Sequence, residues 1–125
     1  MALVLDAGAL IAIERGDAAV LDLLRSARRD GVKVRTTSTV VSQVWRDGRR
    51  QARLSSALRG IEEVAHDRSR SRRIGELLGR AGASDVVDAG VVDIAADGDD
   101  VLTSDVDDLA ELATAAGRRL TLIPI

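Results

Sequence analysis

The stretch Leu3-Val4-Leu5-Asp6-Ala7 decides how the rest of the chain is expected to fold. It is a short apolar run that ends in one acid, and such runs are typical of strands buried on both faces of a parallel sheet. Open α/β sheets place their ligands at the carboxyl ends of their strands. The sequence therefore predicts a strand over residues 2–5, with Asp6 at a ligand-binding edge.

A second segment has the same form. Val101-Leu102-Thr103-Ser104-Asp105 is again an apolar run that ends in an acid, and Asp88 lies in the first turn of a predicted helix. We expect Asp6, Asp88 and Asp105 to meet at one edge of the sheet. Clustered carboxylates repel one another, and a divalent cation reverses that balance. These acids are therefore predicted to bind a metal ion.

Further acids lie one helical turn from two of these positions. Asp85 precedes Asp88 by three residues on roughly the same face, and Asp108 follows Asp105 by three. All four also have an alternative interpretation, as an N-cap or as first-turn acids that complement a helix dipole. Asp6 is less readily explained in that way, because it follows a buried strand and precedes a helix start made of small residues.

Strand and helix patterns alternate along the whole chain, which predicts an α/β fold. The alternation favours right-handed crossovers and a parallel sheet with helices on both faces. A length of 125 residues is typical of one domain, so we expect a single domain over 1–125. Strands are expected over 2–5, 32–36, 61–65, 100–103 and 120–123; helices are expected over 7–14, 18–28, 39–45, 49–58, from Ser69 or Ser71 to Leu78, 85–96 and 106–116.

The composition predicts an unusual core. The chain is 46% hydrophobic but has no Phe, no Tyr and a single Trp, so the core must be built from Val, Leu, Ile and Ala. Trp45 falls on a predicted helix and is expected to pack into that core. The chain has no Cys and no apolar stretch near the roughly 20 residues that a membrane span needs. We therefore expect a soluble protein of the cytoplasm that does not bind membranes.

Charge is segregated along the chain, although the net charge of −2 predicts no partner by itself. The segment from Arg46 to Arg80 is rich in arginine, whereas Ala81 to Gly117 contains no Lys or Arg and many Asp. An acidic site beside an arginine-bearing surface suits a polyanionic substrate, although scattered solvated charges are the alternative. Four arginines around one predicted helix start are candidates for phosphate contacts that position a substrate: Arg46, Arg49, Arg50 and Arg53.

The residues available exclude several chemistries. An all-oxygen site without Cys or a useful His favours Mg²⁺ or Mn²⁺ over zinc. Such an ion can polarise a phosphodiester and activate water for in-line attack. His66, the only histidine, lies in an Arg/Ser-rich loop and is expected at the surface, so a serine triad is excluded. No Gly-rich stretch has phosphate-loop spacing, which argues against an NTPase.

Three blocks of the sequence together resemble a known family. Residues 4–12 (VLDAGALIA), 87–89 (VDA) and 102–109 (LTSDVDDL) look like the acidic blocks of a PIN domain, and the match spans essentially the whole chain. The best fit is to the single-domain PIN proteins that act as VapC toxins. The resemblance implies a three-layer fold with a five-stranded parallel sheet in the order 3-2-1-4-5. It also implies a Mg²⁺- or Mn²⁺-dependent ribonuclease that forms a homodimer and is silenced by an antitoxin.

The resemblance also assigns residues, and one of them departs from the family. The family's second acid is usually a Glu, whereas Gln43 stands at the matching position; its amide is neutral and cannot act as a base. Glu14 is a candidate to supply the missing charge. The other acids of the family correspond by position to Asp6, Asp88, Asp105 and Asp108.

Together these observations predict a metal-dependent endoribonuclease with Asp6, Asp88 and Asp105 as metal ligands. Asp108 is expected to complete the catalytic set. The alternative is a PIN-fold binding module with little or no catalysis, which Gln43 favours. A DNA nuclease or another phosphodiesterase is a third interpretation that the sequence leaves open.

Overall fold

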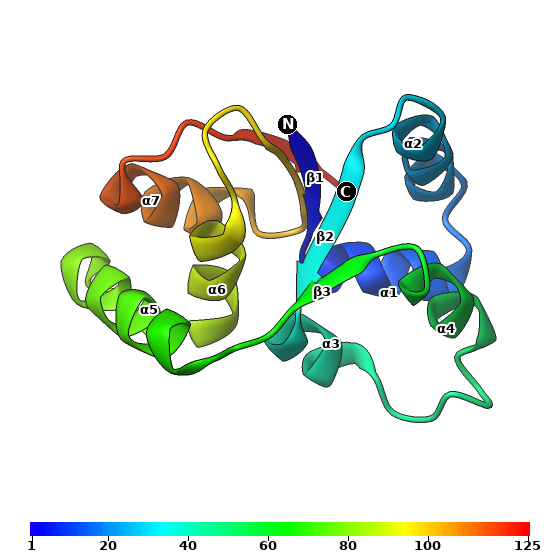
Figure 1. Cartoon of the computed structure of the whole chain (residues 1–125), viewed down its shortest axis with the longest axis horizontal. Helices are drawn as coiled ribbons and strands as arrows, with labels where there is room; N and C mark the ends of the chain where they lie inside the picture. The colour runs from blue at the N-terminus through cyan, green and yellow to red at the C-terminus, as the bar shows by residue number, and fades with distance from the viewer.

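The computed structural model describes residues 1–125 and shows five strands alternating with seven helices (Figure 1). The strands are β1 (Ala2–Leu5), β2 (Lys33–Thr37), β3 (Glu62–Val64), β4 (Asp100–Thr103) and β5 (Thr121–Pro124). The helices are α1 (Ala7–Arg15), α2 (Ala18–Arg29), α3 (Ser38–Val44), α4 (Ala52–Leu58), α5 (Arg68–Ala81), α6 (Val86–Ile94) and α7 (Val106–Ala116). The predicted alternation of strands and helices is confirmed.

All five strands pair in parallel, in the order β3-β2-β1-β4-β5. The central strand is β1, in which Leu3 pairs with Val34 of β2 on one side and with Asp100 of β4 on the other. Every residue of β1 is buried, as its apolar run predicts. The predicted strand order is therefore confirmed, and the ends of β1 and β4 that precede Asp6 and Asp105 are neighbours.

Helices cover both faces of the sheet. Figure 1 shows α5, α6 and α7 packed together on one side and α1, α2 and α4 on the other, with α3 below the sheet. The core between these layers is aliphatic, and its largest fully buried side chains include Leu5, Leu10, Ile13, Leu54 and Leu109. Burying each such side chain contributes about 1.5–3 kcal/mol. None of the seven helices is both long and apolar enough to cross a membrane.

Two local predictions around α3 and α4 are wrong. The helix expected over 49–58 begins only at Ala52, because the Asp47 carbonyl and carboxylate accept the backbone N–H groups of residues 49–51 and form a turn. Trp45, expected in the core, follows the last residue of α3 and is 36% exposed. The backbone turns from helical to extended at Trp45, and the Gln51 amide oxygen accepts the next two N–H groups, so Trp45 lies in the connection to α4 and not on the helix.

The ends of several other elements also shift by one or two residues. The strand expected over 61–65 is limited to Glu62–Val64. The helix expected over 85–96 spans only Val86–Ile94. Asp85 lies just before it as the N-cap, because its carboxylate accepts the Asp88 N–H at 3.0 Å.

Candidate metal centre

Asp6 is held rigidly where β1 passes into α1. One carboxylate oxygen accepts the Ala9 N–H at 3.0 Å, so that Asp6 caps α1. The other oxygen accepts the Thr103 hydroxyl and the Ser104 N–H at the end of β4, the latter at 3.3 Å. Asp6 is only 2% exposed, and burial raises its pKa above 3.8 despite these three donors. The two neighbouring strands therefore fix the orientation of this carboxylate.

Asp88 lies in the first turn of α6 and differs from Asp85, which caps the same helix. The Asp85 carboxylate is used by the cap, whereas the Asp88 side chain accepts no hydrogen bond and is 7% exposed. The pKa of Asp88 rises from 3.8 to about 7, first through burial and then through the negative charges of four neighbouring aspartates. In order of effect these are Asp85, Asp105, Asp6 and Asp108.

Asp105 and Asp108 begin the facing helix, α7. Asp105 occupies the N-cap position, as predicted, but its carboxylate makes no capping hydrogen bond. Its N–H instead donates to the Thr103 hydroxyl at 2.8 Å. Asp108 is exposed in the first turn of the helix. The simple interpretation of Asp105 as a helix cap is therefore wrong, and its carboxylate remains free for another partner.

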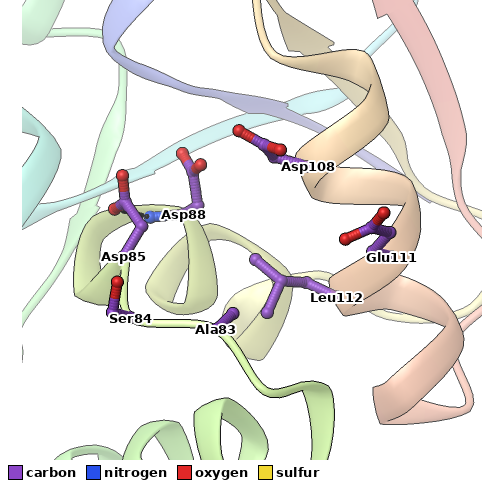
Figure 2. A pocket seen from close by; sticks show the side chains of 7 residues that line it. All are labelled: Ala83, Ser84, Asp85, Asp88, Asp108, Glu111 and Leu112. Carbon is purple, nitrogen blue, oxygen red and sulfur yellow. Dashed lines mark hydrogen bonds between the residues drawn. The ribbon is translucent and has the colours of Figure 1, made fainter.

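A cavity of about 210 Å³, hereafter the acidic cavity, separates the N-terminal end of α6 from α7. Figure 2 shows the carboxylates of Asp85 and Asp88 on one side and those of Asp108 and Glu111 on the other. A second hollow of about 320 Å³ runs along the start of α7 and shares Asp108. Its other lining residues are Ser104, Asp105, Val106 and Asp107.

No basic side chain neutralises this acidic cavity. All the ion pairs of the chain lie elsewhere. Asp93, at the other end of α6, shows the contrast, because Arg70 and Arg73 bind its carboxylate at 2.9 and 3.0 Å. Burial works to raise the pKa of Asp93, but the hydrogen bonds and charges of these two arginines outweigh it and lower that pKa. The acids around Asp88 have no such partners.

The donor set fits a hard divalent cation. Carboxylate oxygens with uncompensated charge are the ligands that Mg²⁺ and Mn²⁺ prefer. No three acidic side chains of the chain converge closely enough to hold one ion in the structure. Binding an ion here would therefore require the carboxylates to close on it.

Two residues suggested to complete the acidic set do not join it. Gln43 is exposed on α3 and does not line the acidic cavity. Glu14 lies in the last turn of α1, about 12 Å along the helix from Asp6. Its carboxylate accepts the Gln51 amide at 3.2 Å. Glu14 therefore supports the segment before α4 and does not supply the charge missing at Gln43.

The four arginines proposed for phosphate contacts divide into two groups. Arg46, Arg49 and Arg50 are exposed on the segment between α3 and α4. Arg53 lies on α4, and its guanidinium donates to the Glu14 carbonyl at 3.2 Å, which caps the end of α1. Arg53 is thus engaged by the fold, whereas the other three form one surface.

Three contributors to the site were not anticipated. Thr103 links Asp6 to Asp105 through its hydroxyl, and Ser104 donates its N–H to Asp6. The sequence feature that could have indicated Thr103 and Ser104 is their position between the apolar residues of β4 and Asp105. Glu111 lines the acidic cavity three residues after Asp108, and this i, i+3 spacing was visible in the sequence.

Comparison with known proteins shows the fold. No protein-family model and no curated protein matches the sequence. Among solved structures, a chain in the crystal structure of VapBC2 from Rickettsia felis bound to a DNA fragment from their promoter has a TM-score of 0.69. The two chains are 14% identical, over 98% of this chain and 99% of that one. The chain therefore has a PIN-like fold, with three layers and a five-stranded parallel sheet in the order 3-2-1-4-5.

Proposed function

We propose that this chain is a metal-dependent endoribonuclease, a VapC-like toxin. The observation that carries the proposal is the unneutralised acidic edge, where Asp88 has a pKa of about 7 beside four other carboxylates. Asp6 and Asp105 follow adjacent strands of a sheet whose carboxyl edge is the usual ligand site of this fold class. The likeness to a chain of the VapBC2 complex supports the same assignment.

Each acid has a distinct role in this proposal. Asp6, Asp88 and Asp105 would hold the ion, and Asp108 would complete the catalytic set. A bound Mg²⁺ or Mn²⁺ supplies a Lewis acid that polarises a phosphodiester and activates water. The chain contributes orientation, because Thr103 and Ser104 fix the Asp6 carboxylate through their hydroxyl and N–H. Binding the substrate phosphates is assigned to Arg46, Arg49, Arg50 and Arg53.

The proposal includes partners. The similar structure is a VapBC2 complex on promoter DNA, and by likeness this chain would pair with a cognate antitoxin. RNA is the proposed substrate. We also propose that the chain forms a homodimer and acts in the cytoplasm.

The test is cleavage of a mixed RNA pool by the purified chain, free of any antitoxin, with Mn²⁺, with Mg²⁺ and with EDTA. We expect cleavage only with metal, and loss of cleavage in Asp88→Asn without loss of the fold. Asp22→Asn is the matched control, because Asp22 is an exposed acid on α2 paired only with Arg25. Cleavage in EDTA, or an unchanged rate in Asp88→Asn, would refute the proposed mechanism.

A second candidate function is a PIN-fold binding module with little catalysis. Two observations favour it: the neutral, exposed Gln43 and the wide spacing of the acids. Calorimetric titration with Mn²⁺ separates the two candidates, since a binding module with a degraded site should show no saturable uptake. A DNA pool run beside the RNA pool tests the remaining alternative of a DNA nuclease.

A further inference from the structure

Trp45 is the only aromatic side chain of the chain, and it is 36% exposed directly after α3. The other exposed large apolar residues lie on α1, on α6 and at the two termini. Val44 before it is buried, whereas the residues that follow it, 46–51, are polar, charged or glycine. Single exposed apolar residues are common, and what distinguishes Trp45 is the ordered, basic segment that carries it.

The segment that carries Trp45 is fixed by one buried glutamine. Gln51 is 6% exposed, and its amide oxygen accepts the N–H groups of Arg46 and Asp47 at 2.7 and 3.0 Å. Its amide nitrogen donates to the Val44 carbonyl at 2.9 Å and to the Glu14 carboxylate at 3.2 Å. The segment is therefore held in one conformation and tied to two helices, which lowers the entropic cost of binding a ligand there.

The same segment concentrates free positive charge. The Arg49 guanidinium makes no hydrogen bond or ion pair, and Arg50 has only a 3.8 Å contact with Asp47 and an 88% exposed side chain. The Arg46 guanidinium donates to two backbone carbonyls and to no acid. The segment of residues 45–50 thus carries three arginines against one aspartate. We define Trp45, Arg46, Arg49 and Arg50 as the Trp45 surface.

The Trp45 surface is joined to the acidic edge by α3. A side chain added at Gly90 of α6 would lie 3.6 Å from the Thr39 hydroxyl, so the first turn of α3 packs beside α6, two residues from Asp88. The seven residues of α3 extend about 10 Å from that point. Figure 1 shows the connection of residues 45–51 running from the end of α3 toward α4. One short polyanion could therefore contact both places.

We propose that the Trp45 surface is a base-stacking site for single-stranded RNA, connected through α3 to the acidic cavity. The inference rests on the proposed ribonuclease function and specifies where the substrate is held. An aromatic ring flanked by arginines is the combination that binds single strands without base readout, by stacking and phosphate contact. Trp and Arg are also enriched at protein interfaces, so a protein partner is the competing occupant that the titrations below distinguish from RNA.

The fluorescence of Trp45 reports on this surface alone, since the chain has no other Trp and no Tyr. We would titrate a short, mixed-sequence single-stranded RNA into Asp88→Asn in EDTA, so that cleavage does not occur. We expect saturable quenching of Trp45, and a matching binding curve from the anisotropy of labelled RNA. Absence of quenching while RNA binds would overturn the proposal, as would equal quenching by poly-glutamate, which would indicate an acidic peptide as the occupant.

Variants distinguish the contribution of ring stacking to RNA affinity from the contributions of side-chain volume and charge. Trp45→Leu retains apolar volume but removes the ring, and should weaken RNA binding by about 5- to 150-fold, whereas Trp45→Phe should retain most of the affinity. Arg49→Ala and Arg50→Ala should each reduce the salt slope by about 0.7. Arg29→Ala on α2, whose side chain is 76% exposed and pairs with Asp30 at 3.8 Å, is the matched control and should change neither quantity. Unchanged affinity in Trp45→Leu would refute the stacking site.

These readouts are independent of catalysis. Failure of the nuclease proposal would appear as an absence of metal-dependent RNA cleavage by the wild-type chain. Failure of the stacking proposal would appear as RNA affinity that does not depend on residue 45, measured without metal.

Discussion

At the scale of single residues, the candidate site depends on a few hydrogen bonds between segments far apart in sequence. Thr103 is fully buried, and its hydroxyl donates to the Asp6 carboxylate while accepting the Asp105 N–H. One hydroxyl thus sets the relative position of two proposed metal ligands. Removing it would leave a buried carboxylate and a backbone N–H with fewer partners, which costs free energy.

Thr103→Val keeps the shape of the side chain but removes this hydroxyl. We expect the free energy of unfolding to fall by about 1–3 kcal/mol, from the partners left unsatisfied, and RNA cleavage to fall with it. Thr103→Ser is the matched control, because it retains the hydroxyl and should retain most of the activity. Urea unfolding and the cleavage assay measure the two effects. Equal activity in the Val and Ser variants would show that the hydroxyl does not orient Asp6.

At the scale of elements, the approach of α1 to the turn after β4 positions Asp6 against Ser104. The approach is close because residue 8, in the first turn of α1, is glycine. A Cβ at that position would collide with the Ser104 side chain and lie 3.3 Å from the Asp6 carboxylate. The first turn of α1 and the end of β4 can therefore hold Asp6 between them only without a side chain at Gly8.

Gly8→Ala should consequently displace Ser104 or Asp6, although Ala favours helices in general. We expect lower metal-dependent cleavage and a lower melting temperature. Gly75→Ala is the matched control in α5, where an added Cβ meets nothing within 4 Å. It should stabilise the chain by up to about 1 kcal/mol and leave cleavage unchanged. Thermal unfolding of both variants decides the prediction, which would be wrong if both changes stabilised the protein equally.

The sequence predicted the elements that depend on local patterns and missed the features that depend on contacts between distant residues. Buried strands and the acids that follow them are local patterns, so the predicted positions of β1, β4, Asp6 and Asp105 correspond to the structure. The start of α4 and the exposure of Trp45 depend on Gln51, whose partners range from Glu14 to Asp47. Contacts of that kind leave no periodic signal, and neither does the bond between Thr103 and Asp6, which are 97 residues apart.

At the scale of the whole molecule, the acids at the two ends of α6 differ in whether basic side chains neutralise them. The acidic cavity lacks a basic partner, whereas Asp93 at the other end of α6 takes two arginines. The fold thus leaves a repulsive cluster unneutralised around Asp88, although the chain has 18 basic residues. Such an arrangement destabilises the metal-free protein, and proton or cation binding relieves it.

The sign of the pH dependence follows from Asp88. Its pKa is about 7 in the folded chain against an ordinary 3.8, so between these values the folded state binds more protons than the unfolded state. The stability of the metal-free chain should therefore fall as pH rises through this range, by at most about 1.4 kcal/mol per pH unit for one proton. Asp88→Asn should flatten this fall in stability, whereas Asp22→Asn should not.

Since a cation competes with the proton on Asp88, Mn²⁺ should raise the melting temperature more at about pH 8 than at about pH 5. An equal effect of Mn²⁺ at both pH values would mean that Asp88 does not take part in binding the ion.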